Sequence, residues 1–147
     1  TLNENASADL GRPGFENDVR PDFTNPTDAV IYELHIRDLS SDSASGISEA
    51  NTGKFLGLTE KGTTNSDGLA TGLDHILDLG VTHIQILPSY DYATVDESKL
   101  DTAQFNWGYD PVNYNVPEGS YSTNPFDGAV RIKEFKEIVF VNGHYSD

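Results

Sequence analysis

Three stretches decide the fold: residues 28–36 read Asp-Ala-Val-Ile-Tyr-Glu-Leu-His-Ile, residues 68–79 follow a helical pattern, and residues 81–87 read Val-Thr-His-Ile-Gln-Ile-Leu. Short runs rich in Val, Ile, Tyr and Leu favour strands. The residues near helical spacing are Leu69, Leu73, Ile76, Leu77 and Leu79. Gly80 then stands where a helix end favours a left-handed residue. Strand, helix, glycine and strand make a βαβ unit, so we expect two neighbouring parallel strands.

The residues outside this unit predict one further helix and two long loops. Residues 127–139 are amphipathic, with Asp127 in the first turn, where it suits the helix dipole. The apolar side of this helix carries Val130, Ile132, Phe135 and Ile138. Residues 37–66 and 88–126 are rich in Ser, Gly, Asn, Pro and Asp, and only Lys54 to Leu58 has apolar weight in the first. Loops of this length in a compact domain are functional or disordered.

The chain divides into an irregular linker at 1–27, a partial α/β domain at 28–139 and a divergent tail at 140–147. The linker is marked by the breakers Gly11-Arg12-Pro13-Gly14 and Asn25-Pro26. An alternation of strands and helices asks for a third strand after residue 139, and none follows. Since a two-stranded sheet is marginal in water, we expect poor cooperativity and aggregation.

Charge and composition restrict the partners. The chain has 147 residues with 24 acidic and 9 basic side chains, a net charge of −15. Such a surface repels phosphate backbones and anionic lipids, so we expect neither a nucleic acid nor a membrane partner, whereas neutral sugars are not penalised. The absence of Cys excludes disulfides and thiolate metal sites. An extracellular or bacterial cell-surface location is favoured over the cytoplasm.

The densest motif is aromatic and polar. It runs Phe105-Asn106-Trp107-Gly108-Tyr109-Asp110-Pro111 and holds the only Trp. Sugar rings stack on aromatic faces, and their hydroxyls bond to Asp and Asn, so the loop suits a carbohydrate. The alternative is a loop that packs its own aromatic side chains onto the domain.

Catalytic carboxylates and metal ligands are not singled out by spacing. Glycoside hydrolysis needs two carboxylates across the scissile bond. The candidates are Asp38, Asp91, Asp96, Glu97, Asp110 and Glu118. Most of the 24 acids are expected to be solvated surface charge. The four His show no zinc-binding spacing, and His35 and His83 are expected to be hydrogen-bonded core or strand-end residues, so we predict no metal site.

Four segments together resemble the type I pullulanases, debranching enzymes of glycoside hydrolase family 13. They are Val30 to Ser40, then Ser48 to Glu60, then Thr82 to Glu97, and Asn106 to Pro111. The last is similar to the signature that separates pullulanases from other family members. The resemblance covers roughly residues 28–139 and implies an incomplete (β/α)₈ TIM barrel with its first two strands and helices and long loops.

The resemblance also implies a substrate and its contacts. The active site of such a barrel lies at the C-terminal ends of the strands, so Asp38, Asp91 and the Trp107–Asp110 loop would face that rim. Tyr109 would stack on a sugar ring. Trp107, Asp110 and Asn106 would be neighbouring contacts to an α-glucan such as pullulan, limit dextrin or glycogen. No cofactor is implied for this chain, and calcium stays open for the complete enzyme.

The departures from the family predict a chain without catalytic residues. The nucleophile, the acid/base and the transition-state aspartate of the family belong to later strands, which would lie beyond residue 147. We therefore expect an enzyme fragment that is inactive alone and lacks the remainder of its barrel as a partner. The alternative is a non-catalytic α-glucan-binding or structural remnant. A related debranching or branching enzyme is a third reading, and the Asn106–Pro111 signature argues against it.

Overall fold

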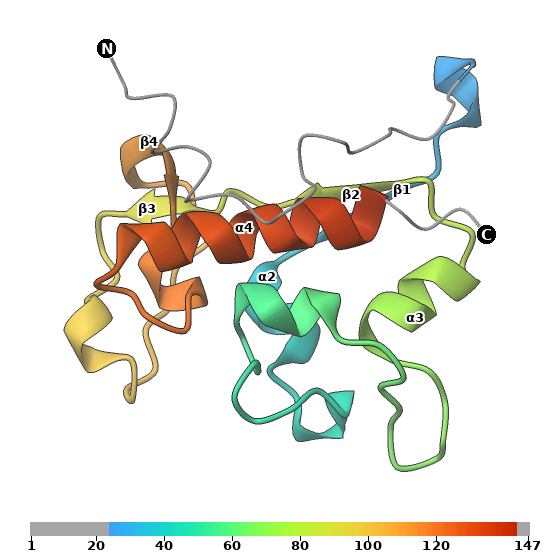
Figure 1. Ribbon diagram of the computed structural model, residues 1–147, viewed down its shortest axis with the longest axis horizontal. Coiled ribbons are helices and arrows are strands. Elements are labelled where there is room, and N and C mark those ends of the chain that lie inside the picture. Colours follow the sequence, from blue (N-terminus) through green and yellow to red (C-terminus); the bar gives the residue numbers. More distant parts are fainter. Residues whose placement is uncertain (1–23, 144–147) are drawn as a thin grey trace.

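The computed structural model describes residues 24–143, which form two separate two-stranded sheets and the helices around them (Figure 1). The strands are β1 (Ile31–Leu34), β2 (His83–Ile86), β3 (Tyr90–Tyr92) and β4 (Pro111–Pro117). The α-helices are α2 (Ile36–Ser40), α3 (Gly72–Asp78) and α4 (Gly128–Gly143). Short 3₁₀ turns are η2 (Pro26–Asp28), η3 (Ser43–Ser45), η4 (Phe55–Thr59), η5 (Glu97–Lys99) and η6 (Gly119–Tyr121).

The predicted βαβ unit is confirmed. Strands β1 and β2 are parallel neighbours, in a register that pairs Ile31 with His83 and Leu34 with Ile86. Gly80 ends the connecting helix with a φ of +70°, and its amide donates to the Leu77 carbonyl at 2.9 Å. A residue with a side chain would be strained in this left-handed conformation.

Helix α3 begins later than the sequence pattern predicted, at Gly72 instead of residue 68. Asn65 is the cause, because its Oδ1 accepts from the amides of Asp67 and Leu69 at 3.0 and 2.9 Å. A bridge between Thr64 and Ala70 closes the same turn. Side-chain bonds of this kind compete with helix formation, and Leu69 is consequently exposed.

The expectation of a plain loop at 37–66 is wrong. His35 begins α2 there, because its Nδ1 accepts from the Asp38 amide at 3.3 Å. Further along, η4 places Phe55 and Leu58 fully in the core. The apolar run at 54–58 therefore has a structural role that its short length concealed.

The expectation of a loop at 88–126 is also wrong. Strands β3 and β4 pair antiparallel there, with register shifts on both sides of Asp91. Asn115 has a φ of +64°, which is uncommon outside glycine, although Asn tolerates it. Pro and Asn are depleted in strands, so the composition of Pro111 to Pro117 concealed β4.

Helix α4 confirms the predicted amphipathic segment and continues to Gly143 rather than ending at 139. Asp127 precedes it and accepts from the Ala129 amide at 2.9 Å, which satisfies a free donor of the first turn. Most of the predicted linker at 1–27, and residues 144–147 of the predicted tail, lie outside the described residues.

One apolar cluster joins these elements, with α4 running across β1 and β2 in Figure 1. Its buried members are Leu34, Ile36, Phe55, Leu58, Ile76, Tyr92, Tyr121 and Ile138. Over residues 24–143, no helix combines the length and the apolar character that crossing a bilayer requires. The α/β class is confirmed, and the two sheets of the described residues do not themselves close into a barrel.

Candidate functional site

The aromatic loop is held by its own polar side chains. Asn106 Nδ2 donates to Asp110 Oδ1 and to Thr94 Oγ1, each at 2.8 Å, and its Oδ1 accepts from the Gly108 amide at 2.5 Å. Asp110 Oδ2 accepts from Thr94 Oγ1 at 2.6 Å. The hydrogen bonds from Thr94 and Asn106 lower the pKa of Asp110, so its carboxylate stays charged at neutral pH.

This bracing presents the large side chains of the loop to solvent. Phe105, Trp107 and Tyr109 are 85%, 68% and 68% exposed. Phe105 and Trp107 contact each other edge to face, with ring centroids 6.0 Å apart. The loop therefore does not bury its aromatic side chains against the domain, as one reading of the sequence had it.

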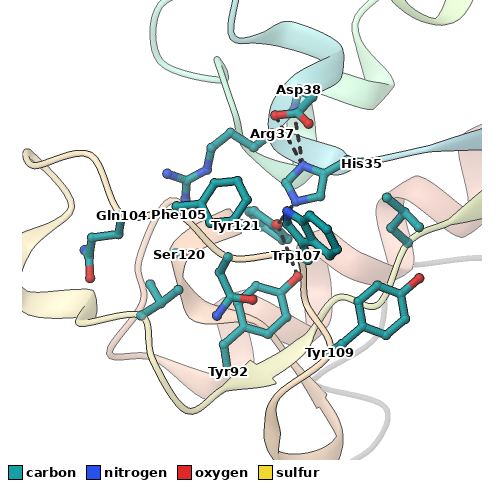
Figure 2. Close-up of a pocket in the computed structure, with 13 residues that line it drawn as sticks. His35, Arg37, Asp38, Tyr92, Gln104, Phe105, Trp107, Tyr109, Ser120 and Tyr121 are labelled. Atoms are coloured by element: carbon teal, nitrogen blue, oxygen red, sulfur yellow. Dashed lines mark hydrogen bonds and ion pairs between the residues drawn. The ribbon is translucent and has the colours of Figure 1, made fainter.

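The exposed rings border a pocket of about 380 Å³ (Figure 2). This volume falls within the ~300–1,000 Å³ usual for small-molecule sites. The side chains that line it include Phe105, Asn106, Trp107 and Tyr109 from the loop, Arg37 and Asp38 from α2, and His35, Tyr92 and Tyr121.

Three side chains that line the pocket, His35, Tyr121 and Tyr92, form a row of hydrogen bonds. Tyr92 Oη donates to the Pro88 carbonyl at 2.5 Å, and the hydroxyls of Tyr92 and Tyr121 are 3.1 Å apart. Tyr121 Oη lies 3.0 Å from His35 Nε2. Since His35 Nδ1 accepts from the Asp38 amide, a neutral ring carries its proton on Nε2 and donates to Tyr121.

Tyr121 Oη therefore lies between the His35 ring and the Tyr92 hydroxyl, and the Tyr92 hydroxyl is also bonded to the Pro88 carbonyl. Burial raises the pKa of both tyrosines, so both hydroxyls stay protonated at neutral pH. Edge-to-face contacts at 5.8 and 5.9 Å fix Tyr121 against His35 and Tyr92. The pocket therefore has a rigid polar base.

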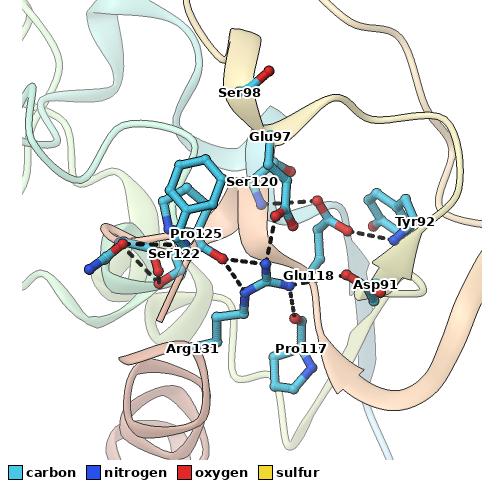
Figure 3. A network of polar contacts seen from close by, with 12 residues as sticks. Asp91, Tyr92, Glu97, Ser98, Pro117, Glu118, Ser120, Ser122, Pro125 and Arg131 are labelled. Atoms are coloured by element: carbon cyan, nitrogen blue, oxygen red, sulfur yellow. Dashed lines mark hydrogen bonds and ion pairs between the residues drawn. The ribbon is translucent and has the colours of Figure 1, made fainter. Parts of the chain in front are cut away.

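A network of carboxylates surrounds Arg131 outside the aromatic pocket (Figure 3). Arg131 pairs with Asp91 at 3.0 Å and with Glu97 at 2.6 Å, and its Nε donates to the Pro125 carbonyl at 2.6 Å. Buried Glu118 accepts from the Tyr92 and Ser120 amides at 2.7 and 2.9 Å. The network ties β3, η5, η6 and α4 together.

Asp91, Glu97 and Glu118 are grouped closely enough to share a cation, since their oxygens lie within 4.8 Å of one another. The Arg131 guanidinium already provides positive charge to two of them. Burial raises the pKa of Glu97, and Arg131 opposes this shift. The arrangement is that of a structural ion-pair network, and these carboxylates do not line the aromatic pocket.

The predicted site residues divide into two groups. Trp107, Tyr109, Asn106 and Asp38 line the pocket, whereas Asp110 braces the loop from behind. Asp91, which was expected at the same rim, instead binds Arg131.

No pattern in the sequence marks Arg37, Tyr92 or Tyr121 as pocket residues, and the sequence predicts His35 to be a hydrogen-bonded core or strand-end residue. The hydrogen bonds of His35 to Asp38 and Tyr121 confirm that reading. No local sequence pattern marks the hydrogen-bonded group of His35, Tyr121 and Tyr92, because His35 and Tyr121 are 86 positions apart.

Comparison with known proteins gives a consistent result. No profile of a protein family matches the chain. It is 48% identical over 118 residues to the pullulanase of Bacillus subtilis (strain 168), which covers 80% of this chain and 16% of that protein. It is 40% identical over 129 residues to pullulanase A of Streptococcus pneumoniae, covering 80% of the chain and 9% of the relative.

A solved structure is similar over almost the whole chain. The pullulanase of Paenibacillus barengoltzii, crystallised with maltohexaose and α-cyclodextrin, superposes with a TM-score of 0.86 at 56% identity. The match covers 92% of this chain and 22% of that one. The chain thus spans 16%, 9% and 22% of the length of these three proteins, and over that segment it is homologous to the pullulanases.

Proposed function

We propose that this segment forms part of the α-glucan-binding face of a starch- or pullulan-debranching glycoside hydrolase. The observation that carries the proposal is the pocket itself, where exposed Trp107 and Tyr109 stand over a rigid base of hydroxyl and imidazole groups. Rings offer stacking faces to a sugar, and the polar base offers hydrogen bonds. The related Paenibacillus pullulanase was solved with maltohexaose, which supports an α-glucan as the ligand.

The proposed setting is a (β/α)₈ barrel. Strands β1 and β2, the helix between them and α4 would be its first two βα units. The pocket lies past the C-terminal ends of β1 and β2, since His35 and Leu87 both line it directly after those strands. This is the face on which such barrels build their sites. The remainder of the barrel would be the partner that this segment requires.

The 147-residue chain by itself is expected to hydrolyse no glucan. Retaining hydrolysis uses two carboxylates roughly 5–5.5 Å apart. Among the described residues that line the pocket, Asp38 is the one carboxylate. The close group around Arg131 is elsewhere and is held by backbone amides and ion pairs. We expect the reacting carboxylates to come from other segments of a complete enzyme.

The sole tryptophan makes binding directly measurable. Maltotriose titrated into the chain should change Trp107 fluorescence in a saturable way. Tyr109→Ala should weaken this binding about tenfold, through the loss of an aromatic contact. Phe126→Ala is the matched control, because Phe126 is also an exposed aromatic residue but lies outside the pocket. Equal affinities in all three proteins would contradict the proposed site.

Catalysis is tested separately with pullulan. We expect no new reducing ends beyond those of a boiled control. Binding of maltotriose without cleavage fits either an inactive fragment or a non-catalytic glucan-binding remnant. Cleavage above the control would show that a complete catalytic pair lies within these 147 residues.

A further inference from the structure

A second and smaller pocket, of about 200 Å³, adjoins the aromatic one and shares Arg37 and Ser120 with it. Lys54, Thr52, Ser41 and Gly53 complete most of its wall. Its volume is below the ~300 Å³ at which sites for drug-sized ligands begin, so it suits a small group better than an oligosaccharide.

Two cations, Arg37 and Lys54, line this pocket. Among residues 24–143, neither Arg37 nor Lys54 forms an ion pair with a carboxylate. This is unusual in a chain with 24 acidic and 9 basic residues, where a cation has many available partners. Burial lowers the pKa of Lys54 and neighbouring Arg37 lowers it further, while Glu134 opposes them. An anion placed between the two cations would relieve this repulsion.

The Arg37 side chain is held in place while its donors stay unused. Its guanidinium carbon lies 5.7 Å from the centre of the Tyr121 ring, a cation–π contact that fixes its position. In Figure 2 the side chain extends from α2 toward the aromatic residues. No hydrogen bond from this guanidinium to a described residue accompanies the contact. Planar guanidinium groups with free donors suit phosphate or carboxylate oxygens.

Lys54 and Ser120 also line this smaller pocket. Lys54 Nζ donates one proton to the Ser120 carbonyl at 2.8 Å, which leaves two donors. The Ser120 hydroxyl is buried and lacks a hydrogen-bond partner in the described part of the chain.

We propose that this pocket binds a small oxyanion of the phosphate type, either free or as a phosphate ester on a sugar that occupies the neighbouring aromatic pocket. The sugar-borne form rests on the glucan binding proposed above, whereas the free form does not. Long-range repulsion by the net charge of −15 disfavours polyanions, which restricts the ligand to one small group at this local concentration of positive charge.

The test is a titration of the 147-residue chain with inorganic phosphate at physiological ionic strength, in which ³¹P NMR monitors the binding. We expect saturable binding that Lys54→Met weakens at least about tenfold, because a charge-assisted hydrogen bond is lost. Lys133→Met is the matched control, since it removes the same charge from an exposed position on α4. Equal phosphate binding by all three proteins, or none by the parent chain, would overturn the proposal.

Further titrations identify whether the phosphate is free or carried by a sugar, and they distinguish binding at this pocket from binding at the aromatic one. Glucose 6-phosphate binding more tightly than inorganic phosphate would support the sugar-borne form, and equal binding would support the free form. Acetate binding as tightly as phosphate would overturn the phosphate assignment. Lys54→Met should keep the Trp107 response to maltotriose, because Lys54 does not line the aromatic pocket. If Lys54→Met fails to fold, Lys54→Arg should retain binding and Arg37→Lys should weaken it.

Discussion

Gly108 is the residue on which the shape of the aromatic loop depends. It lies between Trp107 and Tyr109 with a φ of +87°, in the left-handed region. A Cβ built there would lie 2.9 Å from Tyr92 Oη and closer still to the Pro88 carbonyl. Only glycine allows the loop backbone to approach the hydrogen bond between those two groups.

We therefore predict that Gly108→Ala weakens maltotriose binding and disturbs Trp107 fluorescence. The left-handed conformation alone costs about 1–2 kcal/mol for a residue with a side chain, and the clash adds to this. Gly62→Ala is the control, since Gly62 has a φ of +71° but open space around it. Similar effects of the two substitutions on the loop would show that the contact with Pro88 and Tyr92 is unimportant.

Asp110 gives the loop a predictable pH dependence. Its pKa in the folded chain is lowered, first by the Thr94 hydroxyl and then by the Asn106 amide. A lowered folded pKa contributes stability above the unfolded value, about 3.9 for Asp, and this contribution is lost as pH falls through the folded pKa. The folded conformation of the loop should consequently be stabilised by Asp110 at neutral pH, and it should lose this stabilisation in acid below about pH 4.

NMR titration of the Asp110 carboxyl carbon should give a midpoint below that of an exposed Asp in an unfolded peptide. Asp110→Asn should increase hydrogen exchange at the Ala93 amide, which bonds to the Asp110 carbonyl at 2.9 Å, at neutral pH and not in acid. Asp101→Asn serves as the control on a nearby exposed turn. An Asp110 midpoint at or above the peptide value would refute the bracing role.

Arg131 joins several secondary-structure elements, because its side chain extends from α4 to three other segments. Its carboxylate partners Asp91 and Glu97 are 40 and 34 positions away in the chain, and its side chain is only 13% exposed. Gly119 permits this crossing, since a Cβ there would meet the carboxylate of Glu97 and the guanidinium of Arg131. The helix and the β3–β4 sheet are therefore joined by charge as well as by apolar contact.

We predict that Arg131→Met loosens this junction by about 3 kcal/mol, the cost of leaving partly buried carboxylates without their partner. Amide hydrogen exchange at Tyr92 and Ser120, which both donate to Glu118, should become faster. Lys133→Met on the exposed side of the same helix should change exchange by less than about 0.5 kcal/mol. Unchanged protection in Arg131→Met would show that the apolar contacts suffice.

At the scale of the whole molecule, apolar surface remains exposed around the β1–β2 sheet. Val30, Ile31, Leu79 and Val139 are 49%, 60%, 53% and 43% exposed. In the described residues each strand of this sheet has only one partner, so each has an edge of free backbone groups. Such edges and apolar surfaces pair readily with other chains.

The 147-residue chain alone should therefore unfold over a broad temperature range and self-associate as its concentration rises. Circular dichroism melts and sedimentation velocity measure the two effects. A sharp two-state transition of a monomer would contradict this expectation. Strand-edge pairing, rather than loss of the aromatic pocket, is the physical basis of the prediction.

The sequence by itself determined the βαβ unit, the helix that became α4 and the position of the aromatic loop, whereas the exposure of the loop's rings was decided by the tertiary structure. Apolar periodicity is a local property, and it survives without knowledge of distant contacts. Its limits were equally local: His35 and Asn65 form side-chain bonds that begin α2 and delay α3, and the Pro- and Asn-rich residues of β4 hid a strand.

Only the tertiary structure decided what stands beneath and beside the aromatic rings. The chain from His35 through Tyr121 to Tyr92 joins residues 86 and 29 positions apart, and Arg37 meets Lys54 only because α2 and η4 pack together. Hydrogen bonds and charges between distant segments leave no period in the sequence. They depend on the packing that brings those segments within about 3 Å of one another.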